Sequence, residues 1–330
     1  MKKLSKDLSL KERMAIIEEE IYGEKVKHDM VVKTAEYPKA YVDYLRDGEK
    51  PQALKVGKDE EGGYLVPDEM EEGIIEAAKS KGVMRELATQ IKTRNLLKIP
   101  AVEEHGTAAW IEEGEQLQFT DEKFKINEID AHKVACLVRV TDELLEDSGL
   151  DIEAFIAKNG GEAVGEKEEA AFISGDGAIQ PRGILLDAEV GVATHTINMD
   201  AAIDLYFSVR QPYREKGVWL MSEDVLRILQ KEKTANGRNA WEGDYTKELP
   251  LKLMGHRVYV SDAMPGMEMG NCPIAFGNFS YYWIGDRGNF SVKRLNELYA
   301  DKGMVGFRIT HRVDGRLMLS EAVKTLKIAS

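Results

Sequence analysis

The residues that could do chemistry are few in this chain of 330 residues and lie far apart. There are six histidines and two cysteines, Cys136 and Cys272. No two histidines are three or four residues apart, and neither cysteine has a Cys-x-x-Cys partner, so the sequence contains no local set of metal ligands. A Gly-x-Ser-x-Gly nucleophile elbow does not occur either. We therefore expect no metal, no cofactor and no enzymatic activity.

Pairs of adjacent carboxylates are the remaining chemical candidates, namely Glu103–Glu104, Glu112–Glu113 and Glu168–Glu169. Two carboxylates can divide acid and base roles between them. Adjacent acids on a hairpin point to opposite faces and stay solvated, so a soluble acid–base hydrolase is kept only as a remote alternative. The glycine-rich stretch Ser174–Gly177 follows a helix and lacks the Lys-Ser/Thr of a phosphate loop, which predicts a turn.

The composition is that of a folded, soluble protein with an acidic excess. Hydrophobic residues make up 43% and charged residues 31% of the chain, and the net charge is −13. Residues 101–150 contain 13 acidic and 4 basic side chains. Such a chain lacks the basic surface that binds nucleic acid phosphates tightly, which argues against a sequence-specific reader of nucleic acid. A protein that merely surrounds nucleic acid is not excluded.

The sequence predicts neither a targeting signal nor a membrane segment. The first residues, MKKLSKDLSL, contain lysines without the apolar stretch that comes after them in a secretory signal. The longest apolar runs, such as Val134–Val138, have about five residues, too few to span a membrane. The low number of cysteines fits a reducing cytoplasm.

Alternating apolar and polar residues predict a long hairpin between about residues 99 and 140. On the return strand, Val134, Cys136 and Val138 share one face. Arms of about 15–20 residues would be roughly 50–65 Å long, whereas a compact domain of this size has a radius of gyration of about 19 Å. The hairpin should therefore protrude. Because a lone two-stranded ribbon is marginal in water, we expect it to lie on another copy of the chain.

The rest of the sequence predicts a mixed α and β architecture. Residues 37–51 form a short amphipathic piece closed by Gly48, and nothing in the pattern ties residues 1–50 to the remainder of the chain. Asp314–Gly315 is a tight-turn signal. Periodicity predicts helices over 68–78, 148–175, 201–209 and 223–233, and strands over 217–222, 253–265, 272–279 and 305–313, the last with one buried and one wet face.

Six segments in a fixed order carry a resemblance to a known family: EGGYLVPDEMEEGIIEAAKSKGVMRELAT, LKIPAV, DEKFKINEIDAHKVACLVRVTDELLEDSGLDIEAFI, EEAAFISGDGAIQPRGIL, LMGHRVYVSDAMPG and FRITHRVDGRLMLSEAVKTLKI. Over about Gly62 to Ile328 they resemble the major capsid proteins of tailed phages, which have the Hong Kong 97 fold. The resemblance implies an α+β fold with a scaffolding-like segment (1–51), an N-terminal arm (52–66), a peripheral domain (67–98, 139–186 and 292–314) with a spine helix (148–175), an extended loop hairpin (99–138) and an axial domain (187–291 and 315–330).

The resemblance also implies a function. The chain would be the structural head protein of a phage or prophage, and it would assemble through hexamers and pentamers into an icosahedral shell around double-stranded DNA. Its expected location is the virion, after assembly in the host cytoplasm. Its expected partners are itself, a portal protein and a prohead protease, which in the family often removes an N-terminal segment such as residues 1–51. The alternative is an encapsulin-type compartment, which would need no such removable segment.

Two groups of residues take their expected roles from the resemblance. The hairpin residues expected to contact a neighbouring subunit are Trp110, Leu117, Phe119, Lys123 and Phe124. The founding member of the family crosslinks itself through a lysine and an asparagine, assisted by a glutamate. The equivalent positions here are Asp121, Phe307 and Asp314, of which only Asp314 keeps its chemical character, so we predict no isopeptide crosslinks.

Overall fold

The computed structural model describes residues 36–48, 54, 64–93, 95–104, 123–146, 149, 151–233, 241 and 251–329, with backbone alone for 100–104 and 123–125. These residues form two compact units. Unit 1 contains the described residues up to Ala77, Ala135–Ala163 and Asn289–Thr310; unit 2 contains the described residues of Ala78–Val134, Val164–Gly288 and His311–Ser330. Four elements contribute to both units: α3 (Asp68–Lys79), β5 (His132–Thr141), α6 (Ile152–Ser174) and β13 (Met304–Leu317).

The sheet of unit 1 is built on the first half of β13. Strand β1 (Tyr64–Leu65) pairs antiparallel with β12 (Ser291–Leu295), and β12 pairs antiparallel with β13 in a register that places Ser291 opposite Thr310. Strand β5 also pairs with β13. The predicted alternation holds for Phe307 and Ile309, which are fully buried, but Thr310 on the opposite face is buried as well. The expected wet face is therefore mostly covered.

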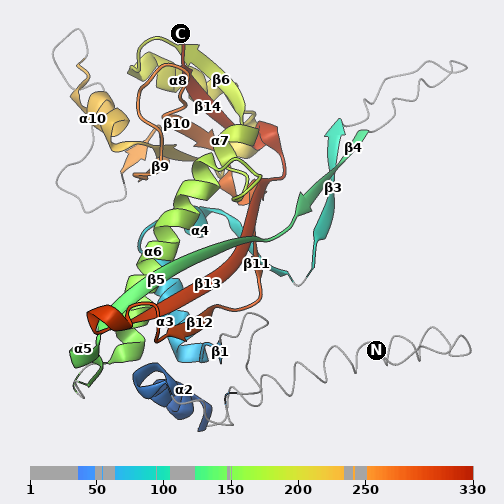
Figure 1. The fold of residues 1–330 in the computed structure, drawn as a ribbon. Coiled ribbons are helices and arrows are strands. Elements are labelled where there is room, and N and C mark those ends of the chain that lie inside the picture. Colours follow the sequence, from blue (N-terminus) through green and yellow to red (C-terminus); the bar gives the residue numbers. More distant parts are fainter. Residues whose placement is uncertain are drawn as a thin grey trace, which may run out of the picture. The chain divides into compact units, whose positions relative to one another are not determined.

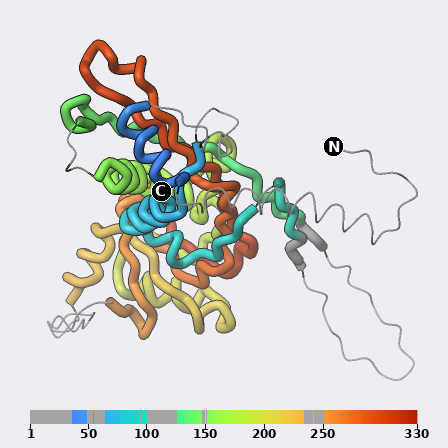
Figure 2. The backbone as a smooth tube through the Cα atoms, turned by 90° about the horizontal axis from the view of Figure 1, so that it is seen from below, coloured from blue at the N-terminus to red at the C-terminus, as the bar shows by residue number. Residues whose placement is uncertain are grey.

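A tyrosine-rich helix, α2 (Glu36–Asp47), packs against this sheet. It lies beside β12 and α5 (Asp142–Glu146), as Figures 1 and 2 show. The helix ends at Gly48, whose φ of 75° is the left-handed conformation that glycine adopts readily. The predicted amphipathic piece is thus confirmed. The expectation that the N-terminal region stands apart is wrong for α2; residues 1–35 lie outside the described part of the chain.

Glu153 gives unit 1 a pH-dependent stability. Burial, followed by the charges of Asp151 and Glu69, raises the pKa of Glu153 to about 7. Because the folded state holds this proton more tightly than the unfolded chain does, the stabilisation is complete below about pH 4.5 and is lost as the pH rises through 7. We expect Glu153→Gln to be more stable than the parent at pH 8 and equal to it at pH 4. Urea unfolding at both pH values measures this, with Glu166→Gln, exposed on the same helix, as the control that shows little change at either pH.

The larger sheet of unit 2 has six strands in the order β6 (Glu189–Thr194), β14 (Val323–Ile328), β10 (Ile274–Gly277), β7 (Val218–Met221), β9 (His256–Val260) and β8 (Lys252–Leu253). The β14–β6 and β7–β9 pairs are parallel and the others antiparallel. The rings of Trp219 and Phe276 contact each other in its core, with centroids 4.3 Å apart and planes tilted by 34°. Helices α8 (Met199–Ser208) and α10 (Glu223–Lys231) contribute Leu205 and Leu229 to the same core.

A second core in unit 2 lies around β11 (Tyr282–Arg287). This strand runs antiparallel to the second half of β13 and parallel to β2 (Thr89–Thr93). The end of α6 places Phe172 in this core, together with Met84 from α4 (Met84–Leu87) and Ile184 from α7 (Ile184–Asp187). The remaining elements are α9 (Gln211–Arg214), η2 (Phe279–Tyr281), η3 (Ala300–Lys302) and η4 (Ser320–Ala322).

Two turn predictions have opposite outcomes. The turn after α6 is confirmed, because Asp176 accepts backbone N–H groups of Ala178 and Ile179 at 2.9 and 3.2 Å. The Asp314–Gly315 turn is wrong, because β13 continues to Leu317. A Cβ on Gly315 would collide with the ring and hydroxyl of Tyr282 on the neighbouring strand. Glycine at position 315 therefore allows the Tyr282 side chain to lie close to the backbone of β13, and it does not form a turn.

The hairpin of unit 2 consists of β3 (Leu97–Glu104) and β4 (Lys123–Ile129), which pair only with each other in the described chain. Figure 1 shows the two strands as a separate ribbon that projects to one side of β11. Its return arm ends at Ile129, since β5 pairs with β13 and not with β3. The prediction of a single hairpin from 99 to 140 is thus corrected at its return arm. Residues 105–122, which include the tip, lie outside the described residues.

Candidate functional site

The predicted contact residues of the hairpin lie mostly beyond the described chain. Trp110, Leu117, Phe119 and the crosslink-equivalent Asp121 are outside the described residues. Lys123 and Phe124 are placed by their backbone in β4, where they pair with Glu104 and Val102. Their role at a subunit interface remains a prediction.

The base of the hairpin, at Asn127 and Ile129, is buried in unit 2, whereas the adjacent residue Ile126 is exposed. Ile129 is fully buried, and Asn127, which is 3% exposed, donates a hydrogen bond to the carbonyl oxygen of Met318 at 3.2 Å. Ile126, on the opposite face of β4, is 60% exposed. Lys98 and Glu128 form an exposed ion pair across the two strands at 2.7 Å. The hairpin is therefore held at its base by buried contacts, and further out it exposes the apolar side chain of Ile126.

Asp314 fastens the link between the hairpin and β5. Its carboxylate accepts the backbone N–H of Asp130 at 2.7 Å and that of Gly315 at 2.8 Å, and His132 Nε2 lies 3.5 Å away. Asp314 is 6% exposed, and Phe307, the other described crosslink-equivalent position, is fully buried. Both residues thus have structural roles here, and the absence of crosslinks stays a prediction.

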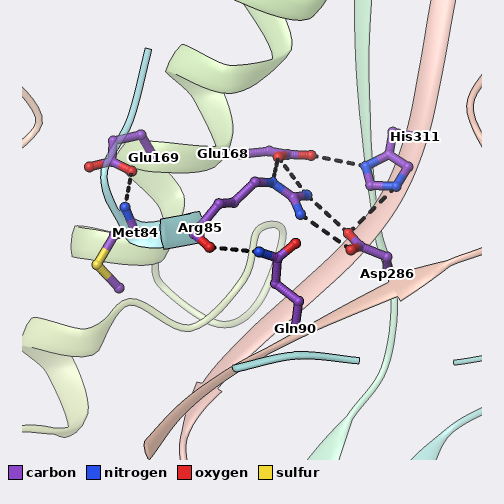
Figure 3. A network of polar contacts seen from close by, with 7 residues as sticks. All are labelled: Met84, Arg85, Gln90, Glu168, Glu169, Asp286 and His311. Carbon is purple, nitrogen blue, oxygen red and sulfur yellow. Dashed lines mark hydrogen bonds and ion pairs between the residues drawn. The ribbon is translucent and has the colours of Figure 1, made fainter. Parts of the chain in front are cut away.

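A buried network of charges ties α4, α6, β11 and β13 together within unit 2 (Figure 3). The Arg85 guanidinium donates to Glu168 Oε2 at 2.8 Å and to both carboxylate oxygens of Asp286 at 2.9 and 3.2 Å. His311 Nδ1 lies 2.9 Å from Glu168 Oε1, and its Nε2 lies 3.6 Å from Asp286. Both Glu168 and His311 are 3% exposed. Four elements distant in sequence are joined by these contacts.

The ionised forms of this network stabilise one another. Burial raises the pKa of Glu168, but the hydrogen bond from His311 and the charge of Arg85 outweigh it, so the pKa lies below its ordinary value. Burial likewise lowers the pKa of Arg85, and the charges of Glu168 and Asp286 more than reverse this shift. Charged groups in a low-dielectric interior persist only when paired in this way.

The contacts of the network hold its side chains to one another. Both ring nitrogens of His311 face carboxylates, which leaves neither free to take a proton from a substrate. The adjoining cavity, lined by Gly82, Gly165 and Phe172 among others, has room for about one water molecule. Its lining includes no serine, threonine or cysteine that could act as a nucleophile.

The neighbouring carboxylate, Glu169, extends the network on the other side of α6. Its two oxygens accept the backbone N–H of Met84 at 3.0 Å and the Ser261 hydroxyl at 2.8 Å. The pair Glu168–Glu169 is therefore buried, with separate partners for each acid, and it does not act as two free carboxylates.

Other chemical candidates give little support to an activity. Within the described ranges, no group of three or more His, Cys, Asp or Glu residues is arranged to hold a metal ion. Burial raises the pKa of the Cys136 thiol to about 11, which keeps it in its unreactive form at neutral pH. A search of the described helices finds none with the length and apolar character needed to cross a membrane.

Comparisons with known proteins point in one direction. The sequence profile of the phage capsid family matches residues 62–328. A major capsid protein from Klebsiella oxytoca phage phiKO2 is 23% identical over 250 residues, which are 70% of this chain and 57% of that protein. The chain thus aligns with little more than half the length of that relative.

Solved structures share the fold. The capsid of a native GTA particle is 27% identical with a TM-score of 0.67, and the match covers 77% of this chain and 91% of that chain. A chain from Gordonia phage Cozz is 13% identical with a TM-score of 0.57, covering 76% and 87% of the two chains. A chain from Mycobacterium phage Bobi is 17% identical, also with a TM-score of 0.57, covering 76% and 91%. The mixed α and β architecture predicted from the sequence is confirmed by these matches.

Proposed function

Since the chain belongs to the phage capsid family, we propose that it is a major capsid protein, which assembles with copies of itself into the shell of a phage head or phage-like particle. The observation that carries the proposal is the family match over residues 62–328. The hairpin supports it independently, because β3 and β4 pair only with each other among the described strands and Ile126 on β4 is 60% exposed. An isolated ribbon of this kind gains stability from a neighbour.

A shell forms when rigid subunits contact one another through exposed segments. The Arg85–Glu168–Asp286–His311 network and the Asp314 contacts supply rigidity at the base of the hairpin. The acidic balance, a net charge of −13, favours a container that does not bind its DNA tightly. The work of this protein is then association, without a chemical step.

Finer features of the proposal come from the family. We propose hexamers and pentamers as building blocks, the six-stranded sheet of unit 2 as the part that meets its copies at their centres, and a portal protein and prohead protease as partners. Residues Trp110, Leu117, Phe119, Lys123 and Phe124 would contact a neighbouring subunit. An encapsulin-type compartment is less well supported, because the relative and the structures described above come from phages and a GTA particle.

Expression of the full chain alone tests the proposal. Negative-stain microscopy and native mass spectrometry should show hollow shells or rings of five and six copies. A small monodisperse monomer at concentrations above about 10 μM would contradict it. Nucleic acid rather than a cargo protein in native particles separates the phage head from the compartment.

Ile126→Asp is expected to reduce assembly at least about tenfold, which corresponds to about 1.4 kcal/mol per subunit contact. The reason is that the side chain is 60% exposed on the hairpin and would bring a charge into an apolar contact with the neighbour. The yield of assembled particles is measured by sedimentation, and urea unfolding of the unassembled subunit should be unchanged. Ile126→Val is the matched control, which keeps the apolar surface. Equal yields of particles for the two variants would show that Ile126 is not part of the interface between subunits.

A further inference from the structure

We propose that α2 is a permanent part of the folded subunit, so that any proteolytic removal of the N-terminal segment stops before Glu36. The family resemblance placed residues 1–51 together as a removable segment. The contacts of α2 separate residues 36–48, which belong to the folded subunit, from the residues that precede them. This inference rests on the proposed function only in expecting a processing protease, since the packing of α2 is a property of the single chain.

The packing of α2 is that of a core helix. Four of its residues are 0–3% exposed: Tyr37, Tyr41, Tyr44 and Leu45. The three aromatic side chains lie on one helical face, and each buries roughly 150–250 Å². On the opposite face, Lys39 and Asp43 are exposed, which gives the helix a clear inner and outer side.

Specific polar contacts fix the register of the helix. The Tyr37 hydroxyl donates to the carbonyl oxygen of Leu65 at 2.9 Å. The Tyr44 hydroxyl accepts the backbone N–H of Arg294 at 2.8 Å, and its ring meets that of Tyr64 edge-on with centroids 4.7 Å apart. These contacts reach β1 and β12, the two strands at one edge of the sheet of unit 1. Removal of α2 would leave the backbone N–H of Arg294 without this partner and would expose Tyr64, now 6% exposed.

The position of α2 limits where a protease can act. A protease needs an extended, accessible backbone, and a docked helix offers one only when it opens. Residues 36–48 are therefore protected in the folded subunit. A cut within 49–63 would sever the chain but leave α2 held by its own contacts. A segment that departs freely must end before Glu36.

Limited trypsin digestion of the purified, unassembled full chain tests the inference. Lys39 and Arg46 are cleavage sites inside α2. After digestion, gel filtration under native conditions separates the core from released peptides, and mass spectrometry identifies both. Residues 36–48 should elute with the core, uncut, whether or not the chain is severed after them. Their release as a free peptide, or rapid cutting after Lys39, would overturn the inference.

Two variants link the protection to the buried face. Tyr41→Ala should speed cutting after Lys39 at least about tenfold, because proteolysis follows the population of the open form. Asp43→Ala, on the exposed face, should cut at the parental rate. If Tyr41→Ala fails to fold, Tyr37→Phe replaces it; this variant loses the hydrogen bond to Leu65 and should be cut about fivefold faster. Equal rates for parent and inner-face variants would contradict the proposal.

Mature particles provide the second test. In particles from cells that contain a head protease, the intact mass of the shell protein should correspond to a chain that begins at or before Glu36. A chain that begins after Gly48 would refute the inference. Failure to form particles would count against the proposed function alone, because the digestion experiment does not require assembly.

Discussion

Glu168→Ala is expected to lower the free energy of unfolding by about 3–5 kcal/mol, the usual cost of leaving a buried charge without its partner. Glu168 Oε2 accepts from Arg85 and Glu168 Oε1 faces His311, and the side chain is 3% exposed. Its removal leaves the Arg85 guanidinium, which is 11% exposed, with Asp286 as its only remaining acidic partner in the network. Urea denaturation of the unassembled subunit measures the change.

The control for this experiment lies half a helical turn away. Glu166 is 65% exposed and pairs with Lys81 at 3.8 Å, so Glu166→Ala should cost less than about 1 kcal/mol. A double-mutant cycle with Arg85→Met separates loss of the pair from loss of either partner. If Glu168→Ala cost no more than Glu166→Ala, the network would not stabilise the subunit.

The sequence predicted where strands occur better than which strands pair. Alternation at Val134, Cys136 and Val138 identified β5 correctly, because side chains alternate between two faces with a period of two. The same pattern says nothing of the partner strand, and β5 pairs with β13 instead of completing the hairpin. Pairing between segments distant in sequence depends on the whole core, which no local pattern encodes.

The buried charges were missed for a related reason. Glu168 and Glu169 were grouped with the adjacent acids of a hairpin, which point to opposite faces and stay solvated, whereas both lie on helix α6. Both lie four residues before buried residues of α6, Phe172 and Ile173, and hence on the same helical face. That spacing was a usable signal for burial. The identity of the partners was not predictable, since Arg85 and His311 are more than 80 residues away from Glu168 in opposite directions along the chain.

The N-terminal region shows the limit of a family resemblance. Gly48 and the amphipathic pattern predicted α2 from local signals alone. The resemblance grouped this helix with a removable segment, whereas its tyrosines are buried in unit 1. The tyrosines are buried by contacts that this particular chain makes. A segment boundary transferred from the family by sequence position carries no information about such contacts.

Gly161→Ala is expected to destabilise the subunit by about 2 kcal/mol although alanine is the better helix former. The gain in helix propensity is about 1 kcal/mol. It is outweighed because the new Cβ would lie 2.5 Å from the carbonyl oxygen of Ile74 and 2.7 Å from Ala77 Cβ on α3. Both obstacles belong to the backbone or its first side-chain atom, so neither can rotate away, and overpacking of this kind costs about 1–3 kcal/mol or more.

The facing helix supplies a control with the opposite sign. A Cβ on Gly73 would meet Ala157 Cβ at 3.5 Å, an ordinary van der Waals contact. Gly73→Ala should therefore stabilise the subunit by up to about 1 kcal/mol through propensity alone. Thermal or urea unfolding of the two variants shows whether packing or helix propensity dominates where α3 and α6 cross. If both substitutions stabilised the protein, α3 and α6 would not approach closely enough for Gly161 to be required, and close packing of these two helices in unit 1 would be refuted.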